Sequence, residues 1–149
     1  MQRDVCTQVE KFLRERHYKL TGPRREVIRI LNASCTPLSV QEVHQQFQAI
    51  KADLASVYRT INLLCELGVL TRLDFQEKLY RYELSDPFAP HHHHLICKKC
   101  GNVENVFEQC LPPGFEERIR QRSGFEIESH ILEFYGLCET CAEQVPSQS

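Results

Sequence analysis

The sequence predicts an α+β protein built from two small domains, and three observations support this prediction. Helical periodicity dominates residues 1–68, whereas short segments with alternating apolar residues dominate the chain after residue 90. Between them, residues 85–90 (SDPFAP) carry two prolines and no periodicity, as expected of a hinge. Charge divides at the same place: residues 1–84 carry 13 Lys and Arg against 10 Asp and Glu, and residues 85–149 carry 5 against 10.

Composition suggests different partners for the two parts. A mildly basic first part can approach phosphates, and an acidic second part rich in His and Cys suits cations, although a chance division of solvated charge would give the same balance. The N-terminus MQRDVCTQVEKF lacks the apolar segment of an export signal, and no apolar run is long enough to cross a membrane. We therefore expect a cytoplasmic protein with no membrane partner, and its eight cysteines suggest metal binding rather than a framework of disulfides.

Four helices are expected in the first part. Val5, Val9, Phe12 and Leu13 recur at helical spacing. A second helix lies within residues 18–31, where Pro23 occupies the first turn and its missing N–H does no harm. A third begins at Ser39, which can form a capping box with Glu42.

The fourth helix is expected over residues 53–68, with Asp53 as its N-cap and Gly68 as its stop. One face is apolar, and the other carries Ser56, Arg59, Thr60 and Asn62. Residues 69–73 and 79–84 then alternate with period two across the polar link DFQEK, which predicts a hairpin. Helices followed by a hairpin predict a winged helix-turn-helix domain over residues 1–84, whose last helix would enter a DNA major groove.

The part after the hinge is expected to form a small α/β domain over residues 91–142. Strands are predicted over residues 91–97, 103–107 and 124–136, with one helix at about 114–122. Residues 143–149 are expected to be a flexible tail.

Two Cys-x-x-Cys pairs carry the strongest chemical signal. Cys97 and Cys100 form one pair, and Cys138 and Cys141 form the other. Two such pairs supply the four thiolates of a tetrahedral structural zinc site. A redox pair is the alternative, but that motif occurs once and opens a helix after a strand. Cys110 lies close enough in sequence to be another ligand, whereas the other three cysteines are expected to be core or surface residues.

The run HHHHLIC predicts two separate metal sites on one strand. Side chains alternate along a strand, so His91 and His93 would share one face, and His92 and His94 the other. His130 alone would more often be a structural histidine, but beside this run it is a candidate ligand. Imidazole and carboxylate ligands suit zinc, iron, manganese, cobalt or nickel.

Four stretches in this order resemble the ferric uptake regulator family: 20–24 (LTGPR), 55–70 (ASVYRTINLLCELGVL), 91–101 (HHHHLICKKCG) and 125–141 (FEIESHILEFYGLCETC). The resemblance covers nearly the whole chain. It implies a homodimeric, metal-dependent DNA-binding repressor with an N-terminal winged helix and a C-terminal α/β dimerisation domain. It also implies control of metal-homeostasis genes, iron or zinc above all, from a palindromic operator.

The resemblance also assigns roles to residues of this chain. The structural Zn2+ matches Cys97, Cys100, Cys138 and Cys141. The regulatory site between the domains, for Fe2+, Zn2+ or Mn2+, matches Glu83, His92 and His94. A second site matches His91, His93 and His130, and its usual carboxylate is assigned to Glu116. Tyr58 and Arg59 match the DNA-contacting pair of the recognition helix, with Ser56 and Thr60 beside them. Lys19 matches a basic residue that reaches the minor groove.

The chain departs from the family at one position. Iron- and peroxide-sensing members draw a histidine ligand from just before the third helix, where this chain has Pro37. Cys35 or His44 could replace that ligand, though neither matches the family pattern. Two other functions stay open: a zinc hydrolase, for which the chain has no HExxH motif, and a metal buffer, which would not explain the winged helix. We expect a regulator and not an enzyme.

Overall fold

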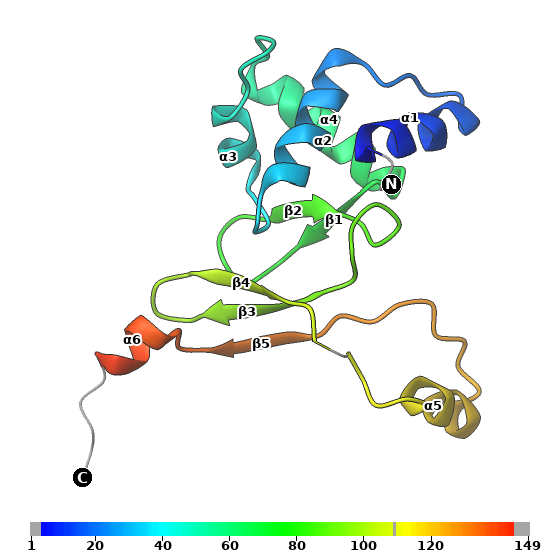
Figure 1. Ribbon diagram of the computed structural model, residues 1–149, viewed down its shortest axis with the longest axis vertical. Helices are drawn as coiled ribbons and strands as arrows, with labels where there is room; N and C mark the ends of the chain where they lie inside the picture. The colour runs from blue at the N-terminus through cyan, green and yellow to red at the C-terminus, as the bar shows by residue number, and fades with distance from the viewer. Residues whose placement is uncertain (1–3, 109, 145–149) are drawn as a thin grey trace. The chain divides into compact units, whose positions relative to one another are not determined.

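A computed structural model describes residues 4–108 and 110–144 and divides the chain into two compact units, with the boundary between Pro90 and His91 (Figure 1). Among the described residues, no helix combines the length and the apolar character needed to cross a membrane.

The first unit is the predicted winged helix-turn-helix. Its elements are the helices α1 (Val5–Glu15), α2 (Gly22–Ala33), α3 (Val40–Gln45) and α4 (Leu54–Glu66), and the strands β1 (Leu70–Leu73) and β2 (Arg81–Leu84). The strands form an antiparallel hairpin in which Leu70 pairs with Leu84 and Leu73 with Arg81. Leu38, before α3, adds one antiparallel bridge to Tyr82. The prediction of four helices and a hairpin is confirmed.

The core of the first unit explains why the polar face of α4 points outward. Val57, Ile61 and Leu64 of α4 are fully buried, as are Val9 and Leu13 of α1. Burial of one apolar stripe on each helix fixes the rotation of that helix about its axis. The remaining side of α4 is therefore left at the surface.

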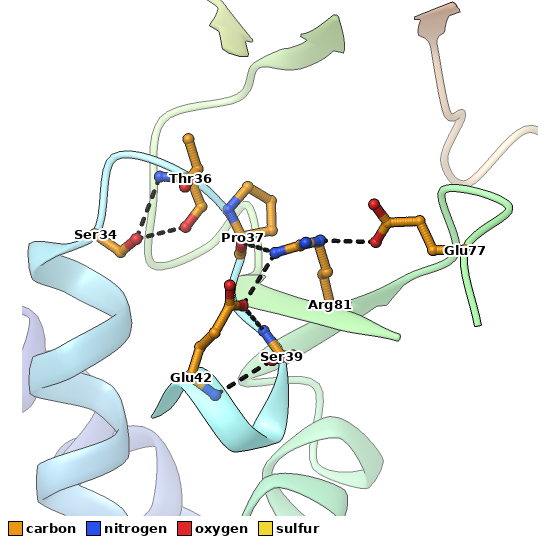
Figure 2. A network of polar contacts seen from close by, with 7 residues as sticks. All are labelled: Ser34, Thr36, Pro37, Ser39, Glu42, Glu77 and Arg81. Carbon is orange, nitrogen blue, oxygen red and sulfur yellow. Dashed lines mark hydrogen bonds and ion pairs between the residues drawn. The ribbon is translucent and has the colours of Figure 1, made fainter. Parts of the chain in front are cut away.

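Arg81 joins the wing to the start of α3 (Figure 2). Its Nε donates to Glu77 at 3.0 Å, and its Nη1 donates to Glu42 at 3.0 Å and to the carbonyl of Pro37 at 3.4 Å. Glu42 also forms the predicted capping box with Ser39. One guanidinium thus ties the glutamate of the α3 capping box and the carbonyl of Pro37 to β2.

The residues predicted as a hinge belong to the first unit. Phe88 is only 9% exposed and packs edge-on against Phe12, with ring centroids 5.2 Å apart. The Ser85 hydroxyl donates to the carbonyl of Val69 at 3.0 Å. The free energy gained by burying the Phe88 ring exceeds the conformational entropy that the segment loses. Residues 85–89 therefore form a packed turn rather than a loose linker.

The second unit is a small α/β domain. Its elements are β3 (His93–Cys97), β4 (Val103–Val106), α5 (Phe115–Ser123), β5 (Glu133–Gly136) and α6 (Glu139–Glu143). The strand order is β4-β3-β5, with β3 antiparallel to β4 and parallel to β5. The prediction of a flexible tail from residue 143 was wrong for its first two residues, because Glu143 ends α6 and Gln144 caps it. Residues 145–149 of that tail lie outside the described residues.

The last strand is shorter than the sequence predicts. Residues 133–136 pair with β3, whereas residues 124–132 form no strand. Phe125 is 70% and Ile131 77% exposed, although both lie in the alternating pattern. The prediction was wrong for residues 124–132 because alternation shows that a segment could pair, while a strand also needs a neighbour with free backbone groups. Of residues 124–136, only residues 133–136 pair with β3.

Candidate metal centres and recognition helix

Four cysteines converge in the second unit. Cys97 ends β3 and Cys100 lies in the turn that follows, while Cys138 caps α6 and Cys141 lies within it. Their Sγ atoms all lie within 4.8 Å of one another, and those of Cys100 and Cys138 are 3.7 Å apart. A zinc–sulfur bond of about 2.3 Å implies a tetrahedral edge of about 3.8 Å, so this spacing fits a Zn2+ ion.

The backbone around these thiols favours metal binding. The N–H groups of Cys100 and Cys138 lower the pKa of the Cys97 thiol to about 6, whereas burial and the neighbouring thiols raise the pKa of Cys141 to about 12. The Cys97 thiolate is therefore the first of the four that a metal would find deprotonated. Gly101 has φ 76° and donates its N–H to the Cys97 carbonyl at 2.9 Å. A residue with a side chain rarely adopts this φ, so the glycine allows the chain to turn back toward Cys97 directly after Cys100.

The histidine run alternates between two faces. Only His93 and His94 belong to β3, yet the alternation extends to the two residues before it. The rings of His91 and His93 lie 4.8 Å apart, and those of His92 and His94 lie 4.9 Å apart. His93 and His94 are both 4% exposed. The run therefore supplies two separate histidine pairs.

The pair of His91 and His93 forms a group with His130 and Cys110. One ligand atom from each of the four residues lies within 4.8 Å of the others. The Nε2 atom of His93 is buried and has no hydrogen-bond partner. Burial, followed by the neighbouring His91 and His130, lowers the pKa of His93 and so favours the neutral imidazole that binds metals. The group fits a metal ion.

Glu116 contacts this group from behind His130. Its Oε1 lies 2.7 Å from Nδ1 of His130, while Sγ of Cys110 lies 2.6 Å from Nε2 of the same ring. The group of four thus contains Cys110 and not Glu116. Sequence reasoning connected Cys110 with the cysteine pairs and assigned the fourth ligand to Glu116 of α5. The place of Cys110 shortly before that helix was a usable signal.

The other predicted regulatory ligands lie on their own units. His92 and His94 form the second histidine pair, and Glu83 is a half-buried residue of β2 paired with Thr71. The side chain of Pro37 is fully buried. His44 uses Nε2 in a 2.8 Å hydrogen bond with the carbonyl of Ala52, so this nitrogen already serves the fold of the first unit. Cys35 lies exposed before α3.

The outer face of α4 carries the predicted DNA contacts. Tyr58 is 48% exposed, and Arg59 is exposed with its Nη2 donating to the Ser56 hydroxyl at 3.1 Å. Asp53 caps the helix through the N–H of Ser56 at 2.7 Å. Thr60 is half-buried on the same helix, and Lys19 is exposed between α1 and α2.

Known proteins share this architecture. The ferric uptake regulator family matches residues 15–135. The ferric uptake regulation protein of Bacillus subtilis is 36% identical over 138 residues, which cover 90% of this chain and 92% of that protein. The solved Helicobacter pylori ferric uptake regulator, described as having three functional metal binding sites, is 25% identical with a TM-score of 0.69 and coverages of 97% and 94%. A zinc uptake regulator solved with zinc and DNA is 26% identical, with a TM-score of 0.60 and 93% coverage of both chains.

The match spans both units, and it includes the winged helix, the histidine run and the first cysteine pair. The chain belongs to the ferric uptake regulator family.

Proposed function

We propose that this protein is a homodimeric, cytoplasmic repressor that binds a palindromic DNA operator in response to iron or zinc. Membership of the family makes the chain a metal-responsive transcriptional regulator. One observation supports the finer proposal: the same chain carries a helix with an exposed polar face and a histidine run that supplies two metal-binding pairs.

The DNA contacts are assigned to α4 and to Lys19. Arg59 and Tyr58 project from the side of α4 opposite its buried stripe, where a guanidinium can reach a base edge or a phosphate. Ser56 and Thr60 stand beside them, and Lys19 adds a positive charge that would reach the minor groove. The solved zinc uptake regulator, a structural relative, is complexed with DNA, which supports a nucleic-acid partner for this chain.

The regulatory metal is assigned to Glu83, His92 and His94. Glu83 lies at the end of the wing, and His92 and His94 form a pair just past the boundary between the units. One ion bound to all three would favour one arrangement of the units over the others, and a difference of a few kcal/mol would change which arrangement dominates. Pro37 cannot ligate metal, so the first unit contributes a carboxylate rather than the histidine of iron-sensing relatives.

A second copy of the chain is the proposed partner of the second unit. Within the described part of that unit, α5 buries none of its residues, and Phe125, Ile131 and Phe134 are at least half exposed. An isolated helix of this length is marginal in water, and such an apolar surface gains free energy when it is covered. Dimerisation through this surface would also place two recognition helices on one duplex.

The proposal is tested by gel mobility of an operator fragment with and without Fe2+, Zn2+ or Mn2+. We expect metal-activated binding that His92→Ala and Glu83→Ala abolish while the dimer stays intact, whereas His93→Ala should act mainly through stability. Equal behaviour of His92→Ala and His93→Ala in both assays would contradict the division of the histidine run. Metal uptake without any change in DNA binding would favour the metal-buffer alternative.

A further inference from the structure

We propose that Cys110 is the fourth ligand of the second metal site, which is then a closed three-histidine, one-cysteine centre selective for zinc, and that Glu116 positions His130 without binding the metal. The proposal goes beyond the proposed function, because neither metal-responsive repression nor the family resemblance gives this site a sulfur ligand. It concerns His91, His93, His130 and Cys110, all within the second unit.

The position of the Cys110 thiol carries the first step. Its Sγ lies 2.6 Å from Nε2 of His130 and within 4.8 Å of a ligand atom of His91 and of His93. The Nε2 lone pair that meets the thiol is the one that a metal would take. A Cys side chain therefore completes the group for which the resemblance expects a carboxylate from the following helix.

The buried nitrogen of His93 is an independent sign of a ligand. Its Nε2 has no hydrogen-bond partner, although His93 is only 4% exposed. An unpaired polar atom in the interior is unfavourable, so such atoms usually have a partner that satisfies them. A metal ion shared with Cys110, His91 and His130 is such a partner.

Glu116 has a different role because it is committed to the other side of the His130 ring. Its carboxylate accepts the Nδ1 proton at 2.7 Å, which leaves the Nε2 lone pair directed toward Cys110. Carboxylates behind histidine ligands commonly fix the ring and its tautomer in this way. The side chain of Glu116 is also 49% exposed, as suits a supporting residue rather than a ligand.

This set of ligands selects the metal and its role. Three imidazoles and one thiolate fill a tetrahedron, the geometry that zinc adopts in structural sites, and they leave no position for water. Sulfur also disfavours the harder ions Mg2+ and Mn2+. Since His91, Cys110 and His130 all lie outside the strands, zinc would fix three irregular segments of the second unit.

Cobalt spectroscopy tests the sulfur ligand directly. The full-length protein is first loaded with one equivalent of zinc, which fills the four-cysteine site, and Co2+ is then titrated. We expect a thiolate-to-cobalt charge-transfer band and tetrahedral d–d bands. In Cys110→Ser the charge-transfer band should vanish, and in Cys110→Asp cobalt should still bind without that band. Cys6→Ser, which removes a half-buried cysteine of the first unit that belongs to no metal-binding group of the described residues, should behave like the wild type.

Two outcomes would overturn the proposal: a charge-transfer band that persists in Cys110→Ser, or no such band in the wild type. Circular dichroism and retention of the first zinc equivalent establish that each variant is folded. A second measurement needs no substitution, because bound zinc should protect Cys110 from alkylation while Cys6, in α1 of the first unit, reacts at an unchanged rate. Equal alkylation of Cys110 with and without zinc would also refute the assignment.

Glu116→Gln separates positioning from ligation. We expect the cobalt spectrum to keep its charge-transfer band while the affinity falls about 10–100-fold, with partial rescue by Glu116→Asp. If Glu116 were the ligand, Glu116→Gln would change the d–d bands and Cys110→Ser would leave them unchanged. Metal-activated DNA binding through His92 is a separate readout, so failure of the proposed function would not be mistaken for failure of this inference.

Discussion

The two units of the chain bury different kinds of residue. The first unit has a continuous apolar core of 17 buried residues, all between Val9 and Phe88. In the described part of the second unit only six residues are buried, and four of them are the potential metal ligands His93, His94, Cys97 and Cys141. The interior of the second unit therefore consists mostly of groups that need a metal.

This contrast indicates where metal acts on stability and where it acts on function. A unit of this size with so little apolar burial lies in the range where a structural metal or a partner chain is usually needed. The first unit has no such need, since its helices bury apolar stripes in one core and side chains cap α3 and α4. Metal should thus hold the second unit together but only reorient the first.

Removal of the structural zinc should have the largest effect. Cys97→Ser should unfold the second unit and spare the first, because binding at a closed cysteine site contributes free energy on the order of 10 kcal/mol to folding. Zinc content and peptide-resolved hydrogen exchange measure both consequences. The matched control is Cys35→Ser, at an exposed cysteine of the first unit. Unchanged protection of residues 91–144 after zinc loss would contradict the contrast between the units.

A cavity in the apolar core should destabilise the first unit and spare the second, the opposite of zinc removal. Ile61→Ala removes a fully buried side chain of α4 and should lower the free energy of unfolding of the first unit by about 2–5 kcal/mol. Leu54→Ala, on the same helix but 42% exposed, should change it by no more than about 0.5 kcal/mol. Chemical denaturation with zinc analysis checks this. Zinc stoichiometry should stay constant, and its loss in Ile61→Ala would show that the units do not fold separately.

The sequence predicted the first unit better than the second for a physical reason. Helix periodicity, the Ser39 capping box and the Asp53 cap are local signals, and each depends on residues no more than a turn or two apart. The convergence of the four cysteines was also predictable, because each pair is local and four thiolates make a complete zinc site. The packing of residues 85–90, predicted as a hinge, was missed because the partner of Phe88 is Phe12, 76 residues away in sequence.

The missed features of the second unit depend on distant residues or absent partners. Nothing local to Cys110 shows that it meets His130, 20 residues later. Alternation over residues 124–132 was read as a strand, but whether a strand forms depends on a neighbouring backbone that the sequence of the segment does not specify. The alternation of the histidine run did predict two histidine pairs, because that pattern needs only an extended backbone.

Substitutions on the DNA-binding face should change DNA affinity without changing the stability of either unit. Arg59→Ala should cost about 1–3 kcal/mol if the guanidinium reads a base. Lys19→Ala should weaken all sequences similarly and reduce the slope of log affinity against log salt by about one. Both residues are exposed, so zinc content and unfolding should match the wild type. Binding assays across salt concentrations measure the difference, and identical slopes for Lys19→Ala and wild type would count against a phosphate contact.

The smallest expected effect concerns Glu26, the one charged side chain buried in the described part of the first unit. Its carboxylate accepts hydrogen bonds from Arg29 at 2.8 and 3.0 Å and from the N–H of Gln48 at 3.3 Å. The bond with Arg29 is the main reason that its pKa falls from 4.5 to about 2. A lowered pKa in the folded state stabilises the fold above pH 4.5, and that stabilisation is lost as the pH falls toward 2.

Glu26→Gln should therefore destabilise the first unit at pH 7 and have little effect near pH 2. The full shift would correspond to about 3 kcal/mol, but Arg29 is half exposed, so solvent screening reduces the expected cost to about 1–2 kcal/mol. Urea unfolding monitored through the methyl NMR signals of Val57 and Ile61 reports the stability of the first unit alone. This isolation matters because protonation of the thiolate ligands releases zinc and unfolds the second unit in the same acid range. A Glu26→Gln cost that stays constant from pH 7 to pH 2 would show that the buried ion pair does not stabilise the apolar unit.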